Sequence, residues 1–178
     1  MTTVMAKNRI KHRFDKWDAN GDGLLERADM EQEAEEIARA FGKAPNSPEG
    51  EAIKAANAGL FDLLAGQAGV AADGRLTEDQ FRSTAENLIF EQGEAAFNRA
   101  LTPLVESIIR LCDKNADGKI NRSEFRSWLS VFGHSAADAD DTFAQIDKDG
   151  NDELTTDELL GALRDYHFGR LSADLIAT

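Results

Sequence analysis

Three stretches of twelve residues place oxygen-bearing side chains at the spacing that a hard divalent cation requires. Ca²⁺ takes about six to eight oxygen ligands, which a twelve-residue loop supplies from positions 1, 3 and 5, from the carbonyl of position 7 and from an acid at position 12. The predicted ligands are Asp18, Asn20, Asp22, Leu24 and Asp29 in loop 1, Asp113, Asn115, Asp117, Lys119 and Glu124 in loop 3, and Asp147, Asp149, Asn151, Glu153 and Glu158 in loop 4. We therefore predict three Ca²⁺ sites.

The three loops differ in how closely they follow this pattern. Loop 3 matches throughout, with Gly118 at position 6, where the chain turns sharply. Loop 1 ends in Asp29, which is one methylene shorter than Glu and is expected to offer a single oxygen. A six-coordinate shell of that kind tolerates Mg²⁺, so we predict that loop 1 also accepts Mg²⁺. Glu26, at position 9, could compensate directly or through a water molecule.

Loop 4 departs from the pattern at position 6, which is occupied by Asp152. A residue other than glycine pays about 1 kcal/mol for a left-handed backbone, and Asp and Asn tolerate this conformation best. Shifting the frame to put Gly150 at position 6 would place Gln145 and Thr156 at the ends, which is a poorer match. We predict a weakened but working site.

A fourth stretch, loop 2 (residues 69–80), has the same length but lacks the ligands. Gly69, Ala71 and Gln80 stand where acids are needed, so this loop is predicted to be structural. The eighth residue of all four loops is aliphatic. We expect Leu76 to pair with Leu25, and Ile120 to pair with Leu154, in short two-stranded contacts.

Apolar residues recur at helical spacing before and after each loop, which predicts four helix–loop–helix units. The expected fold is all-α, a compact globule of two packed pairs that span residues 1–92 and 93–178 and meet at Gly93. Residues 42–50 are expected to form a connecting loop. Thr77 and Gln80 predict a capping box, and Thr102 followed by Pro103 predicts the start of the helix that enters loop 3.

The charge and cysteine content restrict the partners and the cellular setting. The formal net charge of −13 argues against nucleic-acid and membrane partners, which are themselves anionic. Residues 1–14 lack the apolar stretch of a signal peptide, and no later window is apolar enough to span a bilayer. Cys112 is the sole cysteine and is expected to be a buried helix residue. A cytoplasmic monomer is the expectation.

Over residues 5–171 the loops and their flanking helices resemble the EF-hand superfamily. Residues 86–94, 112–118 and 167–171 are similar to the group formed by calerythrin and the sarcoplasmic calcium-binding proteins, which also has a lengthened first half and a silent second hand. The resemblance implies two halves packed face to face, a cytosolic setting and a role in Ca²⁺ buffering. Asp152 in place of Gly departs from the family pattern.

Two other functions stay open. A Ca²⁺ sensor that regulates a protein target exposes a Met-rich groove, whereas this chain has three Met, all within the first thirty residues, and ten Phe. A photoprotein-like binder would enclose an aromatic substrate among His, Trp and Tyr. The residues of these types are His12, His134, His167, Trp17, Trp128 and Tyr166. The buffer is the favoured interpretation, and no catalytic constellation predicts an enzyme.

Overall fold

The computed structural model describes residues 4–172 and 175, and it places a helix before and after every loop. The helices of the described part are α1 (Val4–Trp17), α2 (Arg27–Ala40), α3 (Pro48–Gln67), α4 (Glu78–Glu86), α5 (Glu94–Cys112), α6 (Arg122–Val131), α7 (Ala136–Ile146) and α8 (Thr156–His167). A π-helical segment, η1 (Asn87–Glu91), continues α4. The strands are β1 (Leu24–Glu26), β2 (Arg75–Thr77), β3 (Ile120–Asn121) and β4 (Glu153–Leu154). The predicted all-α class with short two-stranded contacts is confirmed.

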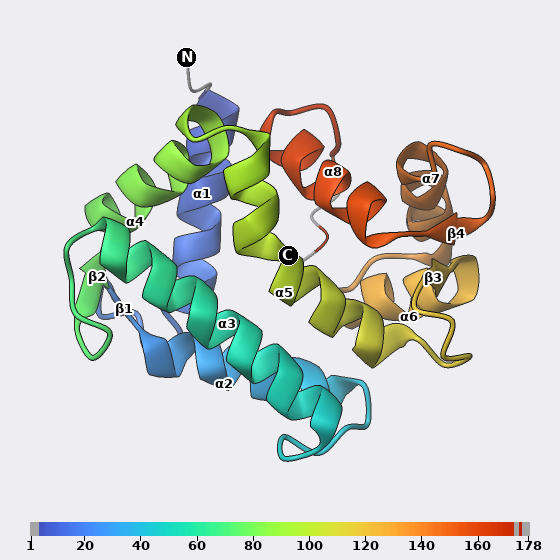
Figure 1. The fold of residues 1–178 in the computed structure, drawn as a ribbon, viewed down its shortest axis with the longest axis horizontal. Coiled ribbons are helices and arrows are strands. Elements are labelled where there is room, and N and C mark those ends of the chain that lie inside the picture. Colours follow the sequence, from blue (N-terminus) through green and yellow to red (C-terminus); the bar gives the residue numbers. More distant parts are fainter. Residues whose placement is uncertain (1–3, 173–174, 176–178) are drawn as a thin grey trace.

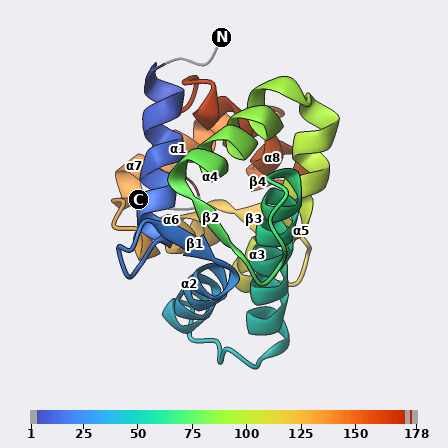
Figure 2. The same ribbon diagram turned by 90° about the vertical axis from the view of Figure 1, so that its left-hand side faces the viewer.

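The four strands form two small antiparallel sheets, β1 with β2 and β3 with β4 (Figure 1). Figure 2, which faces the end of the molecule that carries loops 1 and 2, shows β1 and β2 side by side. Leu25 lies opposite Leu76, and Ile120 lies opposite Leu154, as predicted. All four side chains are buried, so each sheet ties a pair of loops to the core.

The residues that close each loop also begin the following helix. In loop 3, Asn121 is the N-cap of α6 and its side chain accepts a hydrogen bond from the Glu124 amide, while Glu124 accepts one from the Asn121 amide. The predicted box of Thr77 and Gln80 is present at the start of α4. Such reciprocal caps satisfy backbone donors that a helix otherwise leaves unpaired. The end of each loop is therefore fixed by helix capping as well as by sheet pairing.

The predicted helix start at Thr102 and Pro103 is wrong. Helix α5 begins at Glu94, directly after Gly93, and continues through Pro103 to Cys112. The Thr102 hydroxyl donates to the Asn98 carbonyl oxygen one turn earlier (2.7 Å) instead of capping a new helix. Gly93 has a φ of 83° and marks the break between η1 and α5, which is where the link was expected.

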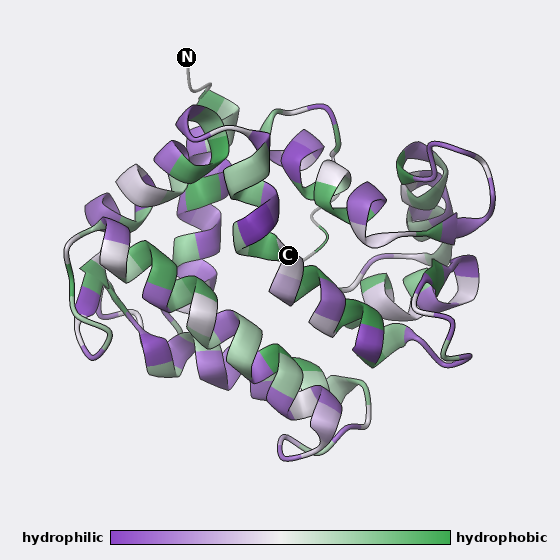
Figure 3. Cartoon of the chain, in the orientation of Figure 1, coloured by the Kyte–Doolittle hydropathy of each residue, from purple (hydrophilic) through white to green (hydrophobic). Residues whose placement is uncertain are grey.

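The core is one continuous cluster that involves all four helix–loop–helix units. Helix α3 packs against α2 and α5, and α5 packs against α8 (Figure 1). The Phe41 ring stacks on Trp128 at 5.4 Å, and the Trp128 indole donates to the carbonyl oxygen of Leu175 (2.5 Å). Figure 3 shows hydrophilic and hydrophobic residues alternating around the helices, as expected for amphipathic helices. No helix in the described ranges is both long and apolar enough to cross a bilayer.

Candidate metal centres

Loop 3 is closed by the carboxylate of Glu124, which is only 3% exposed. Its Oε1 accepts a hydrogen bond from the Lys114 amide at position 2 (2.8 Å), and its Oε2 accepts one from the Asn121 amide at position 9 (2.9 Å). At the other end, Asp113 Oδ2 accepts from the Gly118 amide (2.8 Å). The Glu124 carboxylate thus holds the backbone of the loop at position 2 and at position 9.

Loop 4 repeats this arrangement. Glu158 accepts from the Lys148 amide (3.1 Å) and from the Thr155 amide (3.0 Å), and Asp147 Oδ2 accepts from the Asp152 amide (3.0 Å). Asp147, Asp149 and Glu158 each offer a carboxylate oxygen within 4.8 Å of the others. Three hard, anionic oxygens at this spacing fit Ca²⁺, which prefers carboxylates.

Asp152 adopts the strained backbone that its place in loop 4 requires. Its φ is 62°, close to the 77° of Gly118 at the same position of loop 3. Its side chain lies outside the cluster of predicted ligands and accepts a hydrogen bond from Arg122 (2.9 Å). Loop 3 carries comparable strain at position 4, where Ala116 has a φ of 61° that was not predicted from the sequence.

We expect Asp152→Gly to bind Ca²⁺ at loop 4 up to about fivefold more tightly, because glycine adopts positive φ without the cost of about 1 kcal/mol. The lost ion pair with Arg122 is exposed and contributes little. Calorimetric titration measures the change. Asp152→Asn is the control, since it removes the charge but keeps a residue that tolerates this conformation. Equal or weaker binding by Asp152→Gly would contradict the strain argument.

Loop 1 makes the same turn after its first acid, but its last acid, Asp29, makes fewer contacts with the loop backbone than Glu124 or Glu158. Asp18 Oδ2 accepts from the Gly23 amide (2.8 Å), and Asp22 Oδ1 accepts from the Leu24 amide (2.9 Å). Asp29 accepts from the Glu26 amide (2.8 Å), so its contact is with position 9, whereas Glu124 and Glu158 also reach position 2. Burial raises the pKa of Asp29, and the nearby carboxylates of Glu26, Asp18 and Asp22 add to this effect.

Loop 2 is held by its backbone rather than by acidic side chains. The Gly74 amide donates to the carbonyl oxygen of Ala71 (2.8 Å), and a Cβ at Gly74 would lie 2.5 Å from Val70 Cγ1. This loop nevertheless contributes a charged group to its neighbour, because Arg75 Nε lies 2.5 Å from Glu26 Oε1. This pair was not predicted from the sequence, although the pairing of Leu25 with Leu76 already implied that Glu26 and Arg75 face each other.

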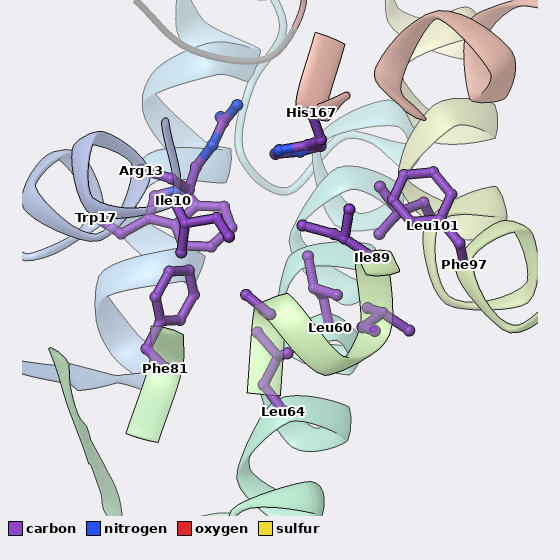
Figure 4. A pocket seen from close by; sticks show the side chains of 12 residues that line it. Ile10, Arg13, Trp17, Leu60, Leu64, Phe81, Ile89, Phe97, Leu101 and His167 are labelled. Atoms are coloured by element: carbon purple, nitrogen blue, oxygen red, sulfur yellow. The ribbon is translucent and has the colours of Figure 1, made fainter. Parts of the chain in front are cut away.

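An apolar cavity of about 60 Å³ lies between the four units (Figure 4). Ile10, Arg13 and Trp17 of α1, Phe81 of α4 and His167 of α8 are among its lining residues. Pockets that hold small organic ligands usually measure about 300–1,000 Å³. At about 60 Å³ the cavity lies below this range, which disfavours an aromatic substrate of photoprotein type as its occupant.

The single cysteine lies next to loop 3 but outside the predicted ligand set. Cys112 is 1% exposed, as expected, and burial raises the pKa of its thiol. A thiolate is a soft ligand that suits other metals, whereas the oxygens of loops 1, 3 and 4 suit a hard cation.

Comparison with known proteins supports the EF-hand family and the fold described above. A family model described as EF hand matches residues 105–130, which include all of loop 3. Calerythrin of Saccharopolyspora erythraea is 56% identical over 176 residues, covering 99% of each chain. The β chain of the sarcoplasmic calcium-binding protein of Penaeus sp. is 29% identical over 156 residues, covering 85% of this chain and 77% of that one.

A solved structure of a calcium-binding protein from Streptomyces coelicolor, described in terms of prokaryotic calcium-mediated regulation, superposes with a TM-score of 0.72. The alignment covers 91% of this chain and 97% of the other, at 25% identity.

Proposed function

Because this chain belongs to the EF-hand family of calerythrin and the sarcoplasmic calcium-binding proteins, we propose that it is an intracellular Ca²⁺ buffer or transporter with three sites. Its relatives are calcium-binding proteins and not enzymes. The proposed sites are loops 1, 3 and 4, with the ligands predicted above, and Mg²⁺ competes at loop 1. The observation that carries the buffer role is the single buried core, to which apolar residues of both halves contribute.

Several contacts between the halves would have to break before a groove could open. Phe41, directly after α2, stacks on Trp128 of α6, and the Arg9 guanidinium of α1 lies 4.0 Å above the ring of Tyr166 in α8. A sensor instead needs helix pairs that open easily and expose adaptable apolar surface. The division into hands 1 and 2 (residues 1–92) and hands 3 and 4 (residues 93–178) fits this picture of two mutually covering halves.

The charge supports the remaining parts of the proposal. A formal net charge of −13 disfavours binding to nucleic acids and anionic membranes, and it opposes self-association through like surfaces. We therefore propose a cytoplasmic monomer whose partners are Ca²⁺ ions.

The second candidate function is Ca²⁺-dependent regulation of a protein target. One observation favours it, a surface groove of about 410 Å³ between α3, η1 and α5. Leu63, which is 37% exposed, and several alanine residues line this groove.

Calorimetry and a hydrophobic dye together test the proposal. We expect three Ca²⁺ per chain and less bound dye after Ca²⁺ is added, because a buffer closes around its ions. Four ions would contradict the structural role of loop 2, and two would implicate Asp29 or Asp152. Increased dye binding after Ca²⁺ is added would contradict the buffer proposal and favour the sensor.

A further inference from the structure

We propose that Arg75, a residue of the ligand-free loop 2, lowers the cation affinity of loop 1 by holding the carboxylate of Glu26. This inference rests on the proposed function, since it concerns a Ca²⁺ site in loop 1. It gives loop 2 a role beyond that of a structural partner, because an arginine there acts on the site next to it.

The pairing of β1 with β2 fixes the two side chains against each other. Glu26 and Arg75 are directly opposite in the antiparallel register, and residues opposite each other project from the same face of a sheet. Arg75 Nε lies 2.5 Å from Glu26 Oε1. The contact therefore follows from the backbone pairing of the two loops.

Glu26 is the acid best placed to complete the shell of loop 1. It occupies position 9, from which a side chain reaches the ion directly or through water. Asp29 at position 12 is short, so loop 1 has more need of this oxygen than loops that end in Glu. Arg75 engages one Glu26 oxygen and places a positive charge beside the site, and both effects oppose cation binding.

The second sheet shows that this arrangement is particular to the pair of loops 1 and 2. The residue at the same place as Arg75 is Glu153, which lies opposite Asn121 in position 9 of loop 3. Lys119, directly before β3, contacts Glu153 (2.5 Å), and both stand at position 7, where the predicted ligand is the backbone carbonyl. The side chains predicted as ligands in loops 3 and 4 are thus not engaged by this ion pair.

The test is a site-resolved NMR titration of the full chain with Ca²⁺ at about 0.05 M ionic strength, where exposed charges are weakly screened. The amides of Gly23, Gly118 and Asp152 donate to the first acid of loops 1, 3 and 4, so each reports on its own loop. We expect Arg75→Gln to lower the Kd followed at Gly23 by about threefold to tenfold. The Kd values followed at Gly118 and Asp152 are expected to stay within about twofold.

Two further variants separate this effect from a general change of charge. Arg27→Gln also removes one positive charge, in this case from loop 1 itself. Arg27 pairs with Glu31 (3.3 Å) and Asp62 (3.6 Å) rather than with a position-9 acid. We expect little change from it. Adding Glu26→Gln to Arg75→Gln is expected to abolish most of the gain, because the released carboxylate is its source.

The outcomes separate failure of the proposed Ca²⁺ site in loop 1 from failure of the proposed role of Arg75. If the Gly23 amide of the unmodified protein does not respond to Ca²⁺, the proposed site in loop 1 fails. If it responds but Arg75→Gln leaves its Kd unchanged, or Arg27→Gln lowers it equally, the role of Arg75 alone is overturned. Unchanged responses at Gly118 and Asp152 establish that the variants are folded.

Discussion

Removal of Ca²⁺ is expected to lower the midpoint of thermal unfolding by about 20 °C. An ion that binds only the folded chain stabilises it by RT ln(1 + [L]/Kd), or about 2.7 kcal/mol at a hundredfold excess over Kd. Three proposed sites then contribute roughly 8 kcal/mol, which is comparable to the whole stability of an ordinary domain. In a chain of this length, about 1 kcal/mol shifts the midpoint by roughly 2–4 °C.

The folded chain is less stable without Ca²⁺ because carboxylates repel one another at the loops, where the flanking helices must stay close. Asp147, Asp149 and Glu158 bring oxygens within 4.8 Å of one another at the junction of α7 and α8. Three Ca²⁺ ions add six positive charges to the formal net charge of −13 and leave −7. The change is concentrated at the proposed sites, which is where like charges are most crowded.

The measurement is thermal unfolding with a chelator and with millimolar Ca²⁺ at matched ionic strength. Without ions we expect far-ultraviolet circular dichroism to retain much of the helix signal, while the near-ultraviolet signal from packed aromatic residues declines. Magnesium at the same concentration is the control, and it should restore only part of the difference. Midpoints within a few degrees of each other would contradict the coupling and weaken the buffer proposal.

The sequence was informative about local geometry, because the loop pattern has strict physical requirements. Leu25, Leu76, Ile120 and Leu154 could be paired in advance, since an aliphatic eighth position needs a buried partner. The left-handed backbone of Asp152 followed from the loop frame in the same way. The ligand roles of the acids remain predictions.

Other features depended on interactions that a local pattern does not contain. Thr102 followed by Pro103 is a typical sequence for the start of a helix. Helix α5 nevertheless begins directly after Gly93, and its tertiary packing keeps it continuous through these two residues. The π-helical segment η1 has no distinct sequence signal. The contact of Glu26 with Arg75 joins residues 49 positions apart and becomes visible only when the register is combined with charge.

The Glu124→Gln variant is expected to lose the Ca²⁺ site of loop 3, with a fall in affinity of at least about 100-fold, or roughly 2.7 kcal/mol. Both oxygens of Glu124 accept hydrogen bonds from backbone amides, of Lys114 and of Asn121. Glutamine has a single oxygen, so its NH₂ group must face one of these two donors in either orientation. The substitution removes the charge that we assign to the bidentate ligand and also one of the contacts that close the loop.

Calorimetry is expected to count two Ca²⁺ per chain in Glu124→Gln instead of three. The Gly118 amide should no longer respond to Ca²⁺, whereas Gly23 in loop 1 still responds. Glu106→Gln is the matched control, because Glu106 is exposed on α5 and the same charge is lost there. Three ions bound to Glu124→Gln would show that loop 3 is not closed on its ion by this carboxylate. If two remain, the stabilisation by Ca²⁺ should fall by about one third, since each bound ion contributes a separate term.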